Sequence, residues 1–379
     1  MKKNHGSRIV AALLAVVMLL AGAPVALAQS PQDPALGAQS TLTAAQQALE
    51  ACVSAYDDRA ADWEELSALY AAAALGDYTA GVDLTGVALP SQAPSAPSAA
   101  VYYALMTGDG AAAKTAAEQL IADGKVADPG YAYGYALNIL AVEAYNNAAD
   151  TPLAYDRANA VTTLLQQRDG DGYTYEGTPL YDTAGLALAA LTLFSDEDAV
   201  GVEQARTALI AWITEGIEQG IGDANSLALV ITGLVAAGEN TDKCLKELLT
   251  CYLGEGKFES SYAPGEPNAF ATKQAARALA EAISGKSFFI EMVNNPHGFR
   301  LVAQQALEAC VSAYDDRAAD WEELSALYAA AALGDYAAGV DLTGVMLPSQ
   351  APSAPSAAVY YALMTGDGAA AKTAAEQLI

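Results

Sequence analysis

The chain has 379 residues, of which 53% are hydrophobic, and its 45 acidic and 18 basic residues give a net charge of -27 at pH 7. So negative a surface repels phosphate backbones and anionic lipids, which argues against nucleic acid and the membrane surface as partners. The hydrophobic fraction argues against an intrinsically disordered chain, because enough apolar surface is available to form a core.

The N-terminus has the pattern of a secretory signal peptide. A basic head with Lys2 and Lys3 precedes an apolar run over about residues 9–20, and Ala26-Leu27-Ala28 supplies a small-x-small cleavage pattern. We therefore predict a signal peptide at residues 1–28 and a secreted or cell-surface, extracytoplasmic protein. An uncleaved membrane anchor is the alternative, since the apolar run approaches the length of a bilayer span. The rest of the sequence contains no second hydrophobic span.

Residues 45–121 recur as residues 303–379, with Ala337 in place of Thr79 and Met346 in place of Ala88. The offset between the copies is 258 residues. We predict a domain at residues 29–300, followed at 301–379 by a partial duplicate of residues 45–121. The sequence is then expected to be a fragment of a longer tandem array. Because the copies are nearly identical, we also expect that 303–379 can replace 45–121 as the partner of residues 122–297.

Within one unit, Asp or Asn before Ala- and Leu-rich stretches predicts three helix starts, because Asp and Asn are preferred N-caps. A less regular extension of the pattern towards the N-terminus adds three more. Partner helices are predicted at 155–167, 200–219 and 241–253, a Pro/Ser/Ala-rich loop at 77–97, and no strand anywhere. The six starts lie near Trp63, Pro97, Tyr131, Asp182, Asn225 and Asn268, and the last three are spaced by 43 residues.

A period of about 40 residues built from two helices is typical of helical hairpin repeats. Six such repeats account for the 258-residue offset between the two copies. This equality favours a closed ring, because an open solenoid would need capping repeats at its ends. The fold class predicted is therefore all-α, an α/α toroid of about six helical hairpins followed by a truncated second copy of its first part.

The loops at 167–173, 220–222 and 256–258 resemble the Q-x-D-G-G-W/F turns of the prenyltransferase and squalene-cyclase repeat. The helices that follow, beginning at Asp182 and Asn268, are similar to those of secreted bacterial members of that superfamily. The resemblance is good over about 131–284 and weaker over 45–124. It implies the same terpenoid-cyclase-like toroid, and the similar secreted proteins are non-catalytic surface modules.

The chemistry of that superfamily does not accompany the resemblance. The D-x-D-D acid of class II terpene cyclases is absent, with Asp196-Glu197-Asp198 the nearest cluster. Zinc prenyltransferases need Asp, Cys and His on one zinc ion. The only histidines of this sequence are His5, in the predicted signal peptide, and His297, outside the repeats. The thioester sequence Cys-Glu-Gln is also missing. A weak likeness of Asp169-Gly-Asp171-Gly to a calcium loop lacks the required length. We therefore predict no metal and no cofactor, and lean towards a protein without catalysis.

The cysteines do not have the spacing of a disulfide scaffold. Cys244 and Cys251 lie about 10 Å apart along one predicted helix, beyond the ~7 Å between Cα atoms that a disulfide spans. We expect them, with Cys52 and Cys310, to be small buried hydrophobes.

Tyrosine is the prominent aromatic residue, with 20 copies against 6 Phe and 3 Trp. In a toroid the starts of the inner helices rim the cavity, and tyrosine offers a flat face for stacking and a hydroxyl for hydrogen bonding. Ordinary packing, with Asp and Asn acting only as caps, is the alternative. The acidic residues Asp62, Glu64 and Glu65 are predicted to form a solvated face. The candidate ligand-binding residues are Tyr131, Tyr133, Tyr135, Tyr173, Tyr175, Tyr181, Asp182, Asn225 and Asn268.

The predicted function is an exported, tandem-repeat binding or interaction module of the bacterial cell surface. Its ligand would be a glycan, a surface protein or a cobalamin-like cofactor, since the cobalamin carriers with this ring bind their ligand at the cavity mouth. One alternative is a carbohydrate-active enzyme, a glycoside hydrolase or polysaccharide lyase, with Tyr and Glu or Asp as base and acid. The other is a structural spacer.

Overall fold

The computed structural model describes residues 34–56, 60–74, 90, 93–126, 131–294, 352–364 and 367–377. The predicted signal peptide, most of the predicted loop at 77–97, and His297 and Cys310 lie outside these residues. The chain divides into two compact units, residues 1–40 and 41–379, and the second unit contains every described helix that begins after residue 41. None of the helices in the described ranges is both long enough and apolar enough to cross a membrane.

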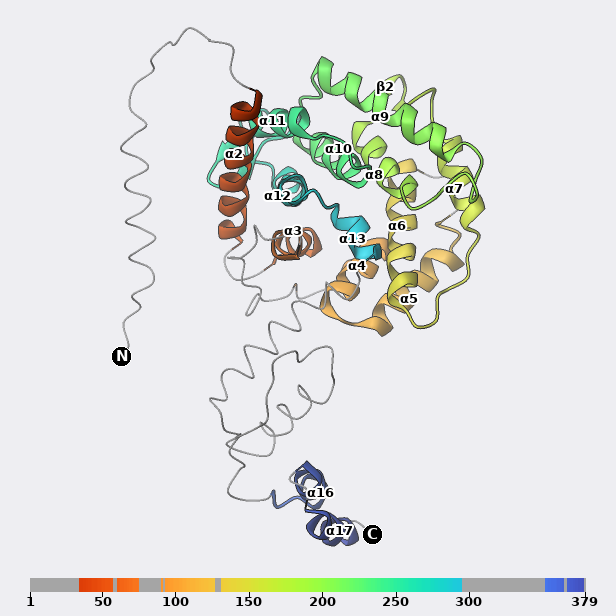
Figure 1. Ribbon diagram of the computed structural model, residues 1–379, viewed down its shortest axis with the longest axis vertical. Helices are drawn as coiled ribbons and strands as arrows, with labels where there is room; N and C mark the ends of the chain where they lie inside the picture. Colours follow the sequence, from red (N-terminus) through yellow and green to blue (C-terminus); the bar gives the residue numbers. More distant parts are fainter. Residues whose placement is uncertain are drawn as a thin grey trace, which may run out of the picture. The chain divides into compact units, whose positions relative to one another are not determined.

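The described chain is predominantly helical, which confirms the all-α prediction (Figure 1). Two antiparallel hairpins of very short strands accompany the helices. The helices are α2 (Pro34–Ala55), α3 (Trp63–Ala74), α4 (Pro97–Thr107), α5 (Gly110–Ala122), α6 (Ala132–Ala148), α7 (Arg157–Gln166), α8 (Tyr181–Leu191), α9 (Val202–Gln219), α10 (Ala224–Ala236), α11 (Asp242–Thr250), α12 (Ala269–Ser284), α13 (Phe288–Asn294), α16 (Pro355–Met364) and α17 (Gly368–Glu376).

Six of the described helices contact one another in an order that closes on itself. α3 packs on α4, α4 on α6, α6 on α8, α8 on α10, α10 on α12, and α12 on α3. These are the six helices whose starts the sequence predicted. α5, α7, α9 and α11 contact members of this cycle as partner helices. The closed order is consistent with a toroid, which stays a prediction.

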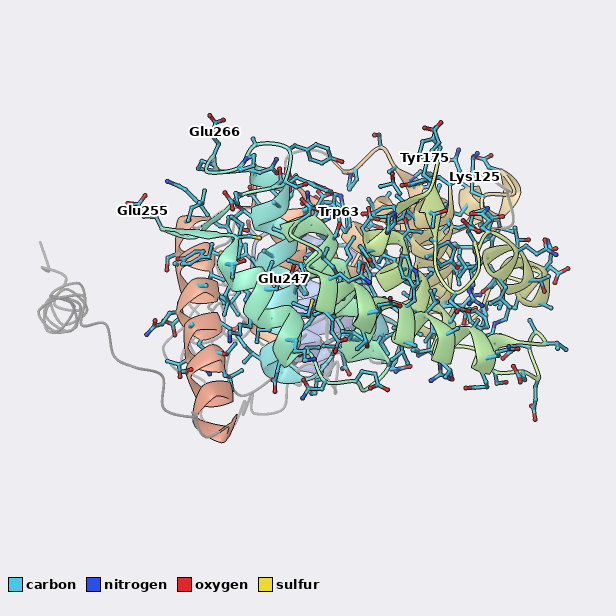
Figure 2. All side chains as sticks on the ribbon, turned by 90° about the horizontal axis from the view of Figure 1, so that it is seen from above. Trp63, Lys125, Tyr175, Glu247, Glu255 and Glu266 are labelled. Carbon is cyan, nitrogen blue, oxygen red and sulfur yellow. The ribbon has the colours of Figure 1, made fainter. Side chains whose placement is uncertain are left out.

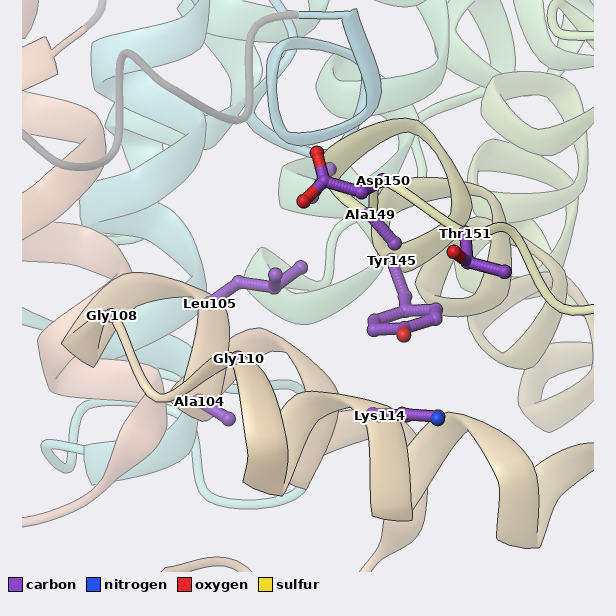
Figure 3. A pocket seen from close by; sticks show the side chains of 10 residues that line it. Ala104, Leu105, Gly108, Gly110, Lys114, Tyr145, Ala149, Asp150 and Thr151 are labelled. Atoms are coloured by element: carbon purple, nitrogen blue, oxygen red, sulfur yellow. The ribbon is translucent and has the colours of Figure 1, made fainter. Parts of the chain in front are cut away.

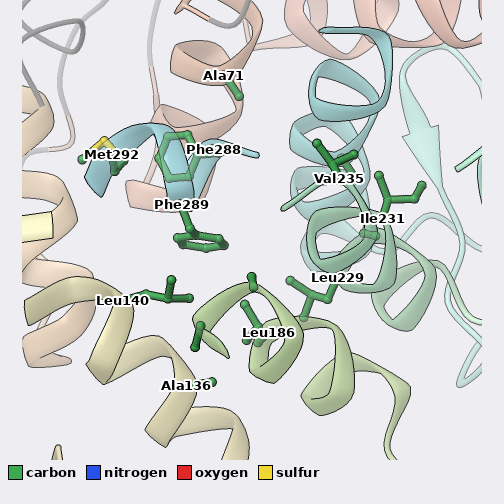
Figure 4. Close-up of a cluster of buried hydrophobic side chains, with 14 of the residues drawn as sticks. Ala71, Ala136, Leu140, Leu186, Leu229, Ile231, Val235, Phe288, Phe289 and Met292 are labelled. Atoms are coloured by element: carbon green, nitrogen blue, oxygen red, sulfur yellow. The ribbon is translucent and has the colours of Figure 1, made fainter. Parts of the chain in front are cut away.

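Helix α13 connects members of the cycle that are not neighbours in its order. It packs mainly on α6 and also contacts α10, and in Figure 1 it lies among α3, α4, α6 and α12. Its aromatic residues Phe288 and Phe289 are fully or almost fully buried. Figure 4 shows Phe289 facing Leu140 and Leu186, while Phe288 and Met292 lie on the opposite side of α13. The core of the cycle is therefore filled by side chains of α13.

The crossing of α8 and α10 depends on two glycines. A Cβ on Gly185 would lie 2.1 Å from the Leu229 carbonyl oxygen, and a Cβ on Gly233 would lie 2.3 Å from the Gly185 carbonyl oxygen. Real Cβ atoms do not approach a backbone oxygen so closely. The two backbones are thus in direct contact, which explains why both positions lack a side chain.

The helix caps agree only in part with the prediction. Asn268 caps α12, where its Oδ1 accepts a hydrogen bond from the Ala271 amide at 2.9 Å. The predicted caps Asp182 and Asn225 are wrong. Helix α8 begins after Leu180, and α10 is capped by Asp223, whose Oδ2 accepts from the Ser226 amide at 3.1 Å. Both predicted residues lie in the first turn, where their side chains cannot reach a free amide two or three residues ahead in the way that a cap does.

The prediction that the chain has no strands is also wrong. β1 (Thr174–Tyr175) pairs with β2 (Thr178–Pro179), and β3 (Tyr252–Gly254) pairs with β4 (Lys257–Phe258). Each turn is a Glu-Gly dipeptide in which both φ angles are positive: 51° and 80° at residues 176–177, and 52° and 71° at 255–256. Such turns suit two-residue hairpins. The strands are too short to show an alternating pattern in the sequence.

Candidate functional site

The N-terminal halves of five helices of the cycle, α3, α6, α8, α10 and α12, line a small cavity of about 20 Å³ together with Phe289 of α13. We refer to its lining as the mouth. In α6, α8 and α10 the sixth residue of the helix supplies a leucine, whereas the sixth residue of α12 is Gln274. The mouth consists of Trp63, Glu64, Tyr133, Leu137, Leu186, Leu229, Gln274, Arg277 and Phe289.

Arg277 is the most unusual residue of the mouth. Its side chain is buried, with 3% of its surface exposed. Nη1 donates to the Ser67 hydroxyl at 3.2 Å, and the guanidinium lies 4.8 Å from the Phe289 ring centroid. Within the described part of the chain, Nε has no hydrogen-bond partner and the guanidinium has no carboxylate within ion-pair distance. The carboxyl groups of Glu64 and Glu281 act on it electrostatically without forming an ion pair, and a buried guanidinium that lacks an ion-pair partner is costly for the fold.

Two further polar groups near Arg277 lack partners. Gln274 is 3% exposed, and no described residue donates to its Oε1. The Tyr102 hydroxyl, on a fully buried side chain, has no hydrogen-bond partner in the described residues either. Buried polar atoms are nearly always hydrogen-bonded, so a group of exceptions calls for a functional explanation.

The acidic and phenolic groups of the mouth hold their protons more tightly than usual. Burial raises the pKa of Glu64, and the neighbouring charge of Asp62 raises it further. Burial also raises the pKa of Asp182, with Asp223 adding to the effect. The pKa of Tyr133 is raised mainly by burial, while Arg277 opposes the shift. The mouth therefore combines one buried cation with the carboxyl group of Glu64, and both this group and Asp182 beside the mouth are easier to protonate than in water.

Some of the predicted tyrosines lie at or beside the mouth. Tyr133 lines it and stacks on Tyr131, whose side chain is 55% exposed, with 6.3 Å between the ring centroids. Tyr175, on β1, is 63% exposed and extends along the same side of the molecule as Lys125 and Glu266 (Figure 2).

Other predicted tyrosines lie in the core or behind the inner helices. Tyr135 and Tyr173 are buried, and the Tyr173 hydroxyl donates to the Leu164 carbonyl at 3.0 Å. Tyr181 packs on Trp212 of α9, with 4.6 Å between the ring centroids. The structure thus does not bring these three tyrosines together with Tyr133.

The polar candidates are divided in the same way. The charge of Asp182 acts on Tyr133, which places Asp182 beside the mouth. Asn225 is half-buried, and its Oδ1 lacks a partner among the described residues. Asn268 is occupied as a cap, and its Nδ2 donates to the Ser260 hydroxyl at 3.2 Å.

Sequence reasoning missed Glu64, Gln274 and Arg277. Asp62, Glu64 and Glu65 were expected to form a solvated face, and this is wrong. Lys273 of α12 forms ion pairs with Asp62 and, at 3.3 Å, with Glu65, while Glu64 lines the mouth. A signal was present in α12, where polar residues recur at 274, 277 and 281 on one helical face of an alanine-rich helix.

A second, larger cavity of about 350 Å³ lies between the α4–α5 turn and the end of α6 (Figure 3). Its charged groups, Lys114 and Asp150, are exposed, and Lys114 lies 3.7 Å from Glu118. No unpaired buried polar atom lines this cavity within the described ranges. The mouth is for this reason the stronger candidate site. The lining is Ala104, Leu105, Gly108, Gly110, Lys114, Tyr145, Ala148, Ala149, Asp150 and Thr151.

The described residues contain no group of three or more His, Cys, Asp or Glu side chains able to hold a metal ion. In the loop with a weak likeness to a calcium site, Asp169 accepts a hydrogen bond from Thr174 at 2.6 Å. Cys52, Cys244 and Cys251 are free thiols in the core, as expected for small buried hydrophobes. Burial raises the pKa of the Cys52 thiol to about 12, which makes it a poor nucleophile at neutral pH.

No protein-family model, curated protein or solved structure matches the chain.

Proposed function

We propose that the chain is an exported binding module of the bacterial cell surface that takes the end of a glycan at the mouth of an α/α toroid. Support for export comes from the signal-peptide pattern at residues 1–28. Support for the toroid comes from the closed order of helix contacts and from the resemblance to the prenyltransferase and squalene-cyclase repeat.

The observation that carries the proposal is Arg277, a buried guanidinium with an unpaired Nε and no carboxylate partner in the described chain. An arginine in this state is stabilised when a ligand supplies an acceptor oxygen. A hydroxyl or carboxylate of a sugar is such an acceptor. Gln274 and Glu64, in the same lining, provide further hydrogen-bonding groups.

The size and the aromatic lining of the mouth favour the end of a sugar chain over a larger ligand. A cavity of about 20 Å³ admits one polar group of the size of a water molecule. The rest of the ligand would then lie outside, against the rings of Tyr131 and Tyr133, and sugars stack on such faces. A cobalamin-like cofactor or a surface protein would contact only this outer aromatic surface.

The test is binding of the full chain to a glycan array and to cobalamin, with Tyr133→Ala as the mouth variant. We expect glycan affinity to fall about tenfold or more, because the stacking face is lost. Ala149→Leu, which fills part of the second cavity, is the matched control and should bind as the unmodified chain does. Binding that is insensitive to Tyr133→Ala but lost in Ala149→Leu would place the site in the second cavity. No binding to any glycan would favour the structural spacer.

A second candidate is a carbohydrate-active enzyme, favoured by the raised pKa values of Glu64 and Asp182. A carboxyl group that stays protonated near neutral pH suits a general acid, and an ionised one nearby suits a base. Release of products from a panel of polysaccharides, abolished by Glu64→Gln, would support this candidate. The binding module is favoured if no polysaccharide is cleaved.

A further inference from the structure

The described structure contains two helical hairpins of the same sequence. α16–α17 repeats α4–α5 at an offset of 258 residues, and the two substitutions between the copies lie outside both hairpins. The local structure repeats as well. Asp109 accepts a hydrogen bond from the Ala112 amide at 2.9 Å, and Asp367 accepts one from the Ala370 amide at the same distance.

The two hairpins differ in what covers them. Tyr102 on α4 is fully buried, whereas its counterpart Tyr360 on α16 is 62% exposed. Leu363 is 59% exposed, although Leu105, its counterpart, is half-buried. The alanines between the two helices of the second hairpin, such as Ala362 and Ala371, remain buried. The second hairpin is thus formed, but its outward apolar face is open.

The first hairpin shows what covers this face. The Tyr102 ring lies 5.2 Å from the Phe289 centroid and 6.4 Å from the Phe288 centroid on α13. Leu105 lines the second cavity together with Tyr145 of α6. Phe288, Phe289 and Tyr145 belong to residues 122–294, which the sequence contains only once, whereas Trp63, which stacks on Tyr102 with 6.2 Å between the ring centroids, belongs to the duplicated range. The chain therefore has two hairpins and one surface that fits them. We call this surface, formed by α6 and α13, the hairpin seat.

We infer that α16–α17 is an alternative occupant of the hairpin seat and exchanges there with α4–α5 of the same chain. Both hairpins present identical side chains, so the contacts made in the seat are the same. Only the covalent connections differ: α5 is joined to α6 by residues 123–131, and residues 295–354 separate α13 from α16. The shorter connection favours α4–α5 in the unmodified chain.

The choice of the chain's own hairpin over that of a second molecule follows from the effective concentration. A tethered segment is present near its target at a concentration on the order of millimolar. The 60 residues at 295–354 have a maximum length on the order of 200 Å, at about 3.4 Å per residue, so the length of the covalent connection does not exclude the second hairpin from the seat. A hairpin from another molecule would have to match that concentration in solution.

The test is a pair of single substitutions and their combination in the full chain, followed by thermal unfolding. Tyr102→Ala and Tyr360→Ala each leave one intact hairpin for the seat. We expect the double variant to lose roughly 10 °C or more in Tm, because a large buried aromatic side chain is removed from every available occupant. Tyr360→Ala alone should leave Tm unchanged, and Tyr102→Ala alone should lose less than half as much as the double variant.

Tyr173→Ala is the matched control, because Tyr173 is buried and has no counterpart in the duplicate. Tyr173→Ala alone should lower Tm by as much as the Tyr102→Ala/Tyr360→Ala double variant does. Adding Tyr360→Ala to it should not lower Tm further. Equal losses for Tyr102→Ala and the double variant would overturn the inference. The milder loss of Tyr102→Ala should also persist on hundredfold dilution of the protein. A loss that grows on dilution would mean exchange between molecules and would contradict the assignment to the same chain.

Discussion

At the residue scale, Glu281 is the buried acid that joins three elements. It is fully buried on α12, accepts a hydrogen bond from the Thr232 hydroxyl of α10, and accepts another from the Phe288 amide of α13 at 2.7 Å. Burial raises its pKa to about 7, although Arg277 and these hydrogen bonds oppose the shift. The first amide of α13 is therefore held by a carboxyl group that titrates near neutral pH.

The raised pKa of Glu281 predicts a pH-dependent stability. The folded chain binds this proton more tightly than the unfolded chain does, whose ordinary pKa is 4.5. The free energy of unfolding should then fall as the pH rises from about 4.5 to about 7, by roughly 3 kcal/mol from this group. Glu281→Gln should lose much less over that range. Urea unfolding of both proteins at pH 5 and pH 8 measures the free energy of unfolding at each pH. An equal change between the two pH values in both proteins would refute the assignment.

At the element scale, the start of α10 shows what a cap contributes. Asp223 accepts from the amide and hydroxyl of Ser226 with one oxygen, and from the amide and hydroxyl of Ser261 with the other. Two residues later, Asn225 is in the first turn, and its Oδ1 has no partner in the described chain. The two side chains are close in sequence and differ in the hydrogen bonds they make.

Asp223→Ala and Asn225→Ala form a matched pair of variants. We expect Asp223→Ala to lower the free energy of unfolding by about 1–2 kcal/mol, because it removes the cap and the link to the loop at Ser261. Asn225→Ala should change it by no more than about 0.5 kcal/mol. Chemical denaturation measures both. A larger loss of stability in Asn225→Ala than in Asp223→Ala would mean that Asn225 is the cap, as the sequence predicted.

The elements also show which features the sequence can predict. The six inner-helix starts were predictable because each combines a polar or proline start with an alanine-rich run, and these are local signals. The choice between Asp223 and Asn225 was not, since either residue type caps a helix. The β1–β2 and β3–β4 hairpins could not be predicted because two or three residues per strand cannot show a period of two.

At the scale of the whole molecule, the closed order of contacts depends on pairs far apart in sequence. Lys273 of α12 pairs with Glu65 of α3 and with Asp62, which directly precedes α3, about 210 residues earlier. The mouth likewise combines Glu64, Tyr133 and Arg277 from three helices. The sequence predicted that inner-helix starts surround a cavity, and it predicted Tyr133. Glu64 could not be identified, because nothing local distinguishes a charge that faces the cycle from a solvated one. Arg277 could have been identified from the polar residues that recur at 274, 277 and 281 on one face of α12.

The central claim is that Arg277 is kept for binding and not for stability, and the most direct test measures both in Arg277→Met. Methionine retains an unbranched apolar side chain against Phe288 and Phe289. It removes one hydrogen bond, to Ser67, and a buried charge that has no ion-pair partner among the described residues, an exchange that is often neutral or stabilising. We expect an unchanged or higher free energy of unfolding together with at least about a tenfold loss of glycan affinity. A variant that is destabilised by more than about 2 kcal/mol and still binds glycan as tightly as the unmodified chain would contradict the account.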